Sequence, residues 1–160
     1  NIKYAVIQSG VKISGTNNIG NFDAERLKQM IAVVKKHRLL SKEHNGDYLT
    51  YEQIRTRAQL GLDSINIAPE FGVRQTRIMV NSGMDFSKAL ETCKNAKKYE
   101  KWIPDEDKAS PSDTMIVEVS GHYSFTEQPF LEQCSKIKGA LRTQLFDRFD
   151  EIYSAWAGVT

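Results

Sequence analysis

A histidine between acidic residues lies in a polar segment a few residues after a short apolar run. The segment is Glu43-His44-Asn45-Gly46-Asp47. Imidazole titrates near neutral pH and binds metals, and a neighbouring carboxylate can fix which ring nitrogen carries the proton. We therefore predict His44 as a metal ligand or acid–base group, with Glu43 and Asp47 as catalytic carboxylates. An exposed loop histidine explains the same pattern equally well, since a lone histidine is a weak metal signal.

The residues near this segment also include groups that could bind a phosphate. Lys42 can neutralise a phosphate and, as the less favoured alternative, could form a Schiff base. Glycines after apolar runs, here Gly10 and Gly46, leave backbone N–H groups open to phosphate oxygens. Simple turn formation is the more frequent reason for such glycines. We predict Gly10, Lys42 and Gly46 as substrate-binding residues.

Three short apolar runs, each followed by polar turn residues, predict the strands that position these groups. The runs are residues 4–7, residues 39–40 and residues 62–67. Amphipathic helices are expected between them, with Asp23 and Thr50 as their N-caps. Strands that alternate with helices indicate βαβ crossovers and a parallel sheet, so the fold class is α/β.

The carboxyl ends of parallel strands meet at one edge of a sheet, and α/β folds place their sites there. Asn66 lies at the end of the third run and Glu70 follows it, so both join this polar group, and we predict Glu70 as a catalytic carboxylate. We expect Leu40 and Ile65 at buried strand positions. Three strands alone leave sheet edges unpaired, which predicts pairing with further chain or oligomerisation.

The second half of the chain is mainly helical in its apolar spacing. Residues 73–102 and 131–156 follow the helical period, and residues 104–112 form a linker. Residues 115–119 fit a strand or a buried helix equally well. We interpret His122 as a packing or solvent-facing residue rather than part of a site.

Composition excludes several classes of protein. Lys and Arg number 22 against 20 Asp and Glu, and the resulting net charge of +2 gives no basis for a nucleic-acid partner. The apolar runs are too short for a membrane span. The cysteines, Cys93 and Cys134, lack metal-ligand spacing and fit free thiols in a reducing compartment, so we expect a cytoplasmic protein.

The strand-end motifs resemble the class II aldolases, and more closely the non-catalytic, chaperone-like subunit of tagatose-bisphosphate aldolase. The similar stretches are residues 5–11 followed by residues 17–19, then residues 42–48 and residues 65–71, in the same order and at similar spacing. Together they extend from Ile2 to about Arg77. The resemblance implies that the chain is the C-terminal portion, about three βα units, of a TIM (β/α)8 barrel with a helical C-terminal tail. Residues 1–80 would then be the closing βα units and residues 81–160 a helical extension of the same domain.

The resemblance also implies roles for individual residues. His44 would occupy the place of a zinc ligand, the loop at Asn45 and Gly46 would contribute to a phosphate site, and Asn66 would reach the substrate. The catalytic enzymes of the family carry another zinc histidine after the sixth strand. This chain has Ser9-Gly10 there, which departs from the pattern.

Two functions follow as hypotheses. The first is a metal-dependent aldolase-type lyase of carbohydrate metabolism that cleaves or isomerises a phosphorylated sugar with a divalent metal, most plausibly zinc. The alternative is a non-catalytic subunit that stabilises a class II aldolase. The expected partners are a phosphorylated sugar and either the remaining N-terminal part of the barrel or another subunit, including a second copy of the chain.

Overall fold

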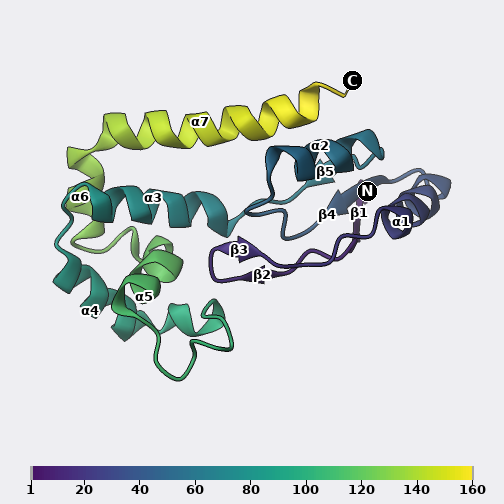
Figure 1. Cartoon of the computed structure of the whole chain (residues 1–160). Helices are drawn as coiled ribbons and strands as arrows, with labels where there is room; N and C mark the ends of the chain where they lie inside the picture. Colours follow the sequence, from purple (N-terminus) through teal and green to yellow (C-terminus); the bar gives the residue numbers. More distant parts are fainter. Residues whose placement is uncertain (1, 160) are drawn as a thin grey trace. The chain divides into compact units, whose positions relative to one another are not determined.

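The computed structural model describes residues 2–159 and has a mixed α/β fold (Figure 1). The described residues form two compact units. The first unit comprises residues 2–13, 17–68 and 148–159, and the second comprises residues 14–16 and 69–147.

Three short strands of the first unit form a parallel sheet in the order β1-β4-β5. The strands are β1 (Tyr4–Ile7), β4 (Leu40–Glu43) and β5 (Ser64–Ile65). Ile7 is the register partner of Glu43, which in turn is the partner of Ile65. The predicted parallel sheet is therefore confirmed, with β5 shorter than the apolar run that predicted it.

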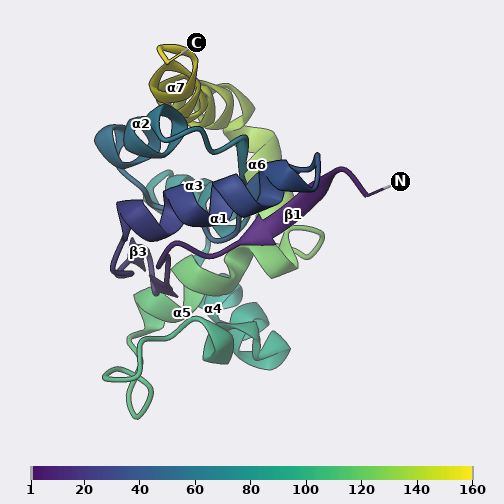
Figure 2. The ribbon, with the colours of Figure 1, turned by 90° about the vertical axis from the view of Figure 1, so that its right-hand side faces the viewer.

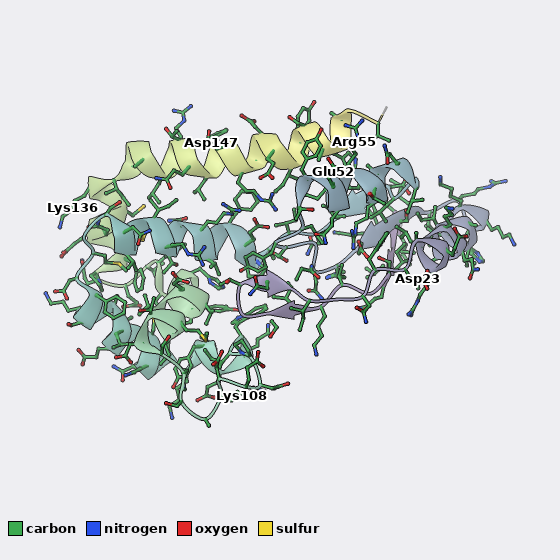
Figure 3. The ribbon with its side chains drawn as sticks, in the orientation of Figure 1. Asp23, Glu52, Arg55, Lys108, Lys136 and Asp147 are labelled. Carbon is green, nitrogen blue, oxygen red and sulfur yellow. The ribbon has the colours of Figure 1, made fainter. Side chains whose placement is uncertain are left out.

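Helix α1 (Ala24–Lys36) connects β1 to β4 and begins where the sequence predicts. The side chain of Asp23, labelled in Figure 3, accepts a hydrogen bond from the backbone N–H of Arg26 at 3.0 Å. The helix contacts both β1 and β4, and Figure 2 shows it alongside β1. Buried side chains of this helix, of β1 and of the segment before β5 form one apolar cluster: Ile7, Leu27, Ile31, Val34 and Leu62.

Helix α2 (Tyr51–Gln59) connects β4 to β5 and has the predicted Thr50 cap. Thr50 and Gln53 form a capping box, in which each side chain accepts a hydrogen bond from the backbone N–H of the other. Ile54, fully buried on this helix, packs in a cluster with Ala155 of helix α7 (Lys138–Ala157).

One face of the sheet is exposed. Tyr4, Val6 and Leu40 are 44%, 54% and 43% exposed. Side chains alternate between the two faces of a strand, so Leu40 faces away from the side on which Ser41 and Glu43 are buried. The prediction that Leu40 is buried is therefore wrong, because the helices cover only the opposite face.

The polar segment after β1, predicted only as turn residues, contains a short hairpin. Strands β2 (Ile13–Ser14) and β3 (Asn17–Asn18) pair in a separate two-stranded sheet. The backbone N–H of Ile19 donates to the carbonyl of Lys12 at 2.8 Å.

The second unit is helical. Its elements are α3 (Pro69–Asn81), α4 (Phe86–Ala96), η1 (Lys98–Lys101), α5 (Asp113–Ser120), η2 (Gly121–Ser124), α6 (Phe130–Lys136) and the first part of α7. Residues 73–102, predicted to be helical, form more than one helix, because Gly83 takes a left-handed conformation and Asp85 caps a new helix. Residues 115–119, whose sequence fits a strand or a buried helix, are helical and fully or partly buried.

The core of the second unit contains Met79, Val117 and Phe130, none of which is exposed to solvent. Cys93 lies in this core, and both it and the partly buried Cys134 are free thiols. Burial raises the pKa of the Cys93 thiol. Within residues 2–159, no helix is both long and apolar enough to cross a membrane.

Candidate functional site

The carboxyl ends of β4 and β5 are joined by backbone hydrogen bonds, as parallel pairing requires. The N–H of Asn66 donates to the carbonyl of Glu43 at 2.8 Å, and the N–H of Gly46 donates to the carbonyl of Asn66 at 3.0 Å. The structure therefore brings together the segments that contain Glu43, Gly46 and Asn66. Because the Gly46 N–H is engaged with Asn66, it is not the open donor that the sequence predicted for a phosphate.

Glu43 lies on the helix-covered face at the end of β4 and is fully buried. Its carboxylate accepts a hydrogen bond from the Ser9 hydroxyl and one from Nε of Arg57 at 2.6 Å. Arg57 belongs to α2 and is 2% exposed. An ion pair removed from water in this way is tightly coupled, and loss of one partner leaves an uncompensated charge.

Arg57 makes further contacts that fix its side chain. Its Nη1 donates to the carbonyl of Gln53 at 3.0 Å, and its guanidinium lies 4.1 Å from the centre of the Phe22 ring. Arg57 thus connects α2 with Glu43 and with Phe22, which lies just before α1. Ser9 and Arg57 were not predicted as partners of Glu43, because they lie 34 and 14 residues from it along the chain.

The other two predicted catalytic carboxylates are also buried and engaged. Oδ1 of Asp47 accepts a hydrogen bond from the backbone N–H of Ala68 at 2.9 Å and so ties the loop after β4 to the segment after β5. Glu70 lies in the first turn of α3, in the second unit, and not in a strand-end loop. Its Oε1 accepts from Nε of Arg74 at 3.0 Å.

Lys42 and His44 are partly buried, unlike the fully buried Glu43. Strand alternation places Lys42 on the exposed face of the sheet, where its Nζ lies 5.7 Å from the centre of the Tyr4 ring. His44 is the first residue after β4. Asn45, the next residue, is exposed.

The loop after β4 holds two non-glycine residues in a left-handed backbone conformation. Asn45 has φ of 59° and Tyr48 has φ of 60°. Asparagine tolerates this conformation, whereas tyrosine does so at a cost of about 1–3 kcal/mol. Such conformations persist only where surrounding contacts hold them, and they are concentrated at functional sites.

The loop after β1 contains a close backbone crossing at Gly10 and Gly20. A Cβ atom on Gly10 would lie 1.8 Å from the carbonyl oxygen of Asn21, and one on Gly20 would lie 1.8 Å from the carbonyl oxygen of Gly10. Gly10 also has φ of +107°, which side chains disfavour. Gly10 therefore has a backbone role in shaping the loop, beside its predicted role in substrate binding.

A metal ion at His44 would need further ligands. Structural and catalytic zinc sites use three or four protein ligands. Within the described part of the chain, no three His, Cys, Asp or Glu side chains are grouped so that they could hold a metal ion. Both carboxylate oxygens of Glu43 and Oδ1 of Asp47 take part in the bonds given above. The donor set described for this chain does not by itself fit zinc, and the metal stays a prediction.

A hollow of about 250 Å³ lies in the first unit, beside β5 and α7. Its lining is mostly apolar and consists of Asp63, Ser64, Ile65, Phe149, Ile152, Tyr153 and Trp156. None of the site residues predicted from the sequence lines this hollow. Asp63 is engaged at its rim, where its carboxylate accepts from the Ser41 hydroxyl at 2.7 Å.

His122 in η2 packs against Gly72 of α3, within the second unit. A Cβ atom on Gly72 would lie 2.5 Å from Cβ of His122, so the two elements are in close contact. Nδ1 of His122 is buried and has no hydrogen-bond partner among the described residues. Burial, and then the charge of Lys101, lower the pKa of His122. This packing role agrees with the interpretation from the sequence.

The fold of the chain is similar to part of a longer protein of known structure. The chain is similar to the crystal structure of a probable tagatose 6-phosphate kinase from Sinorhizobium meliloti 1021, with a TM-score of 0.59 and 17% sequence identity. The similarity covers 98% of this chain and 45% of the other, so the chain spans less than half of that protein. At this identity the similarity shows the fold alone. No protein-family model matches the chain. No curated protein matches it either.

Proposed function

We propose that the chain is the closing part of a class II aldolase-like (β/α)8 barrel and binds a phosphorylated sugar at the carboxyl ends of β1, β4 and β5. The observation that carries the proposal is the loop after β4, whose left-handed residues Asn45 and Tyr48 flank Gly46 and Asp47. The similar solved structure is named for a sugar-phosphate kinase, which supports a phosphorylated sugar as the ligand. The class of reaction, cleavage or isomerisation, comes from the resemblance of the strand-end motifs.

In this proposal the predicted site residues have different tasks. His44 and Asn45 follow β4 directly and would face the sugar, together with the Asn66 side chain. Lys42, which carries a positive charge, would meet the phosphate. Glu43 and Asp47 would hold the two loops in place through their buried bonds. A divalent metal, if it binds at His44, would polarise a carbonyl group.

A second function is favoured by one specific observation. The three predicted catalytic carboxylates, Glu43, Asp47 and Glu70, are buried and engaged in bonds within the chain. Because these carboxylates are already engaged, they support the proposal that the chain keeps the fold of an aldolase and has lost its catalytic activity. The alternative proposal is therefore a non-catalytic subunit that stabilises a class II aldolase.

The exposed face of the sheet supports a partner in either case. Tyr4, Val6 and Leu40 form an apolar surface on the strands, and such surfaces mark sites of association. We include in the proposal that the rest of the barrel or another subunit, including a second copy of the chain, covers this face.

Calorimetric titration with tagatose 6-phosphate tests ligand binding, with unphosphorylated tagatose and inorganic phosphate as comparisons. Binding is expected for the phosphorylated sugar and should weaken about ten-fold or more in His44→Ala, because a hydrogen bond to a charged or polar partner is lost. The matched control is His37→Ala, which removes an exposed histidine at the end of α1. Equal affinities of the sugar and of phosphate alone would contradict the proposal.

Cleavage of tagatose 1,6-bisphosphate, measured with zinc and with a chelator, separates the two functions. Metal-dependent turnover that His44→Ala abolishes would support the lyase. Full turnover in His44→Ala would exclude the catalytic role of this residue. Absence of turnover, combined with a higher melting temperature of a class II aldolase in the presence of the chain, would support the non-catalytic subunit.

A further inference from the structure

Asn18, in strand β3 of the first unit, connects the loop after β1 with the loop after β4. Its side-chain Nδ2 donates to the carbonyl oxygens of Asn45 and Asp47, each at 3.0 Å. Its Oδ1 accepts from the backbone N–H groups of Lys12 at 3.3 Å and of Gly20 at 3.4 Å. One side-chain amide therefore makes four hydrogen bonds to two loops that are far apart in the sequence.

The two carbonyls bound by Asn18 lie on either side of Gly46, within the strained part of the loop. Asn45 itself has the left-handed backbone, and Tyr48 follows Asp47 directly. The bonds of Asn18 belong to the contacts that hold this conformation against its cost. Without the Nδ2 donor, two carbonyl groups would lose a partner, and a shift of the loop toward ordinary backbone angles would become favourable.

An amide side chain is specifically suited to this position. The carbonyls of Asn45 and Asp47 need two donors, and the N–H groups of Lys12 and Gly20 need an acceptor. Aspartate offers acceptors only, and a hydroxyl offers one donor. Asparagine provides both donors and the acceptor within a short side chain.

We propose that Asn18 is a positioning residue for the sugar-phosphate site, because it fixes the loop that presents His44 and Asn45. This inference rests on the proposed function for the identity of the ligand. Its geometric part, the clamp on the loop after β4, stands on the four hydrogen bonds alone.

The decisive variant is Asn18→Asp, which keeps the shape and the acceptor and removes both donors. Its carboxylate would face the carbonyls of Asn45 and Asp47, so the clamp becomes repulsive. Asn17→Asp is the matched control, since Asn17 lies in the same strand, is exposed and undergoes the same change of charge. Asn18→Ala removes the clamp without adding a charge, and circular dichroism checks that each variant is folded.

Amide hydrogen exchange at Gly46 measures the clamp without any ligand. The Gly46 N–H is bonded to the carbonyl of Asn66, so its exchange reports whether the loop opens. We expect exchange at least about ten-fold faster in Asn18→Asp and Asn18→Ala, and unchanged exchange in Asn17→Asp. Unchanged exchange in both Asn18 variants would overturn the clamp.

Titration with tagatose 6-phosphate then tests the positioning role. The affinity should fall about ten-fold in the Asn18 variants and stay within two-fold in Asn17→Asp. A looser loop with unchanged affinity would overturn the role in ligand binding. If the unchanged chain does not bind the sugar phosphate while Asn18→Asp loosens the loop, the proposed function is overturned and the clamp is supported.

Discussion

At the scale of single residues, the buried pair of Glu43 and Arg57 gives the strand ends their fixed arrangement. The pair connects β4 with α2, and Ser9 adds the loop after β1. A buried charge pair is weak evidence for added stability, because removing two charges from water is costly. We expect the pair to favour this arrangement of β4 and α2, since separating the two side chains inside the unit would leave a buried charge without its partner.

Arg57→Met should destabilise the chain by about 3–5 kcal/mol, because Glu43 remains charged and loses its partner. The measurement is the free energy of unfolding from urea titration followed by circular dichroism. Arg55→Met is the control, since Arg55 on the same helix donates to the neutral hydroxyl of Tyr51, and its loss should cost about 1 kcal/mol or less.

The double variant Glu43→Gln with Arg57→Met tests the coupling itself. Once Glu43 is neutral, the loss of Arg57 leaves no buried charge. The destabilisation of the double variant should therefore be smaller than the sum of the two single effects. Additive effects would show that the two side chains act independently.

The positions of the candidate site residues relative to the strands could be predicted from the sequence, but the directions of their side chains could not. His44, Asn45 and Gly46 do follow β4, and the loop after β4 is joined to Asn66 as parallel strands predict. The burial of Glu43 under α2 depends on which face of the sheet the helices cover. That face is decided by tertiary packing, so the role of Arg57 could not be predicted from local sequence.

At the scale of elements, the two caps recognised in the sequence predicted where two helices begin. Asp23 and Thr50 begin α1 and α2 as expected, because their side chains satisfy backbone N–H groups of the first turn. Residues 73–102 were predicted as helical without a break, since apolar spacing continues across it. Asp85 carried the missing signal there, as the cap of α4.

His122 lies at the contact between η2 and α3, and we expect it to make the free energy of unfolding depend on pH. The lowered pKa of His122 means that the folded chain binds its proton less readily than the unfolded chain, where histidine titrates near pH 6.5. Neutral His122 contributes fully to the free energy of unfolding above about pH 6.5. This contribution is lost as the pH falls from there through the lowered pKa of the folded chain.

Urea unfolding at about pH 7.5 and about pH 5.5 measures this dependence. The free energy of unfolding should fall more in the unchanged chain than in His122→Gln, which cannot be protonated in this range. His37→Gln, with its exposed imidazole, should behave like the unchanged chain. An identical pH dependence in the unchanged chain and His122→Gln would contradict the prediction.

At the scale of the whole molecule, the exposed sheet face predicts association. A chain with Tyr4, Val6 and Leu40 on its surface should self-associate as its concentration rises, because apolar area leaves water on contact. Val6→Glu should shift the chain to the monomer in sedimentation velocity. Val33→Glu on α1 is the control, since Val33 is 55% exposed and comparable to Val6 at 54%.

A monomer at all concentrations would contradict this prediction, as would equal effects of the two substitutions. The face itself could be predicted only in part. Three strands with two connecting helices indicate that one face of the sheet is covered. The residues of β1 are apolar on both faces, so its sequence does not show which face the helices cover. Leu40 was predicted as buried because it lies in an apolar run. Val6 shows equally that an apolar strand residue can be exposed.

The crossing of the backbone at Gly10 and Gly20 has a consequence for how this sequence can change by mutation. A side chain at either position would overlap a carbonyl group, and the backbone shift that admits one side chain has to move the segment containing the other glycine. Single substitutions away from glycine are therefore disfavoured at both positions. In descent from a common ancestor we expect the two glycines to be inherited together, while the exposed Lys12 between them varies freely.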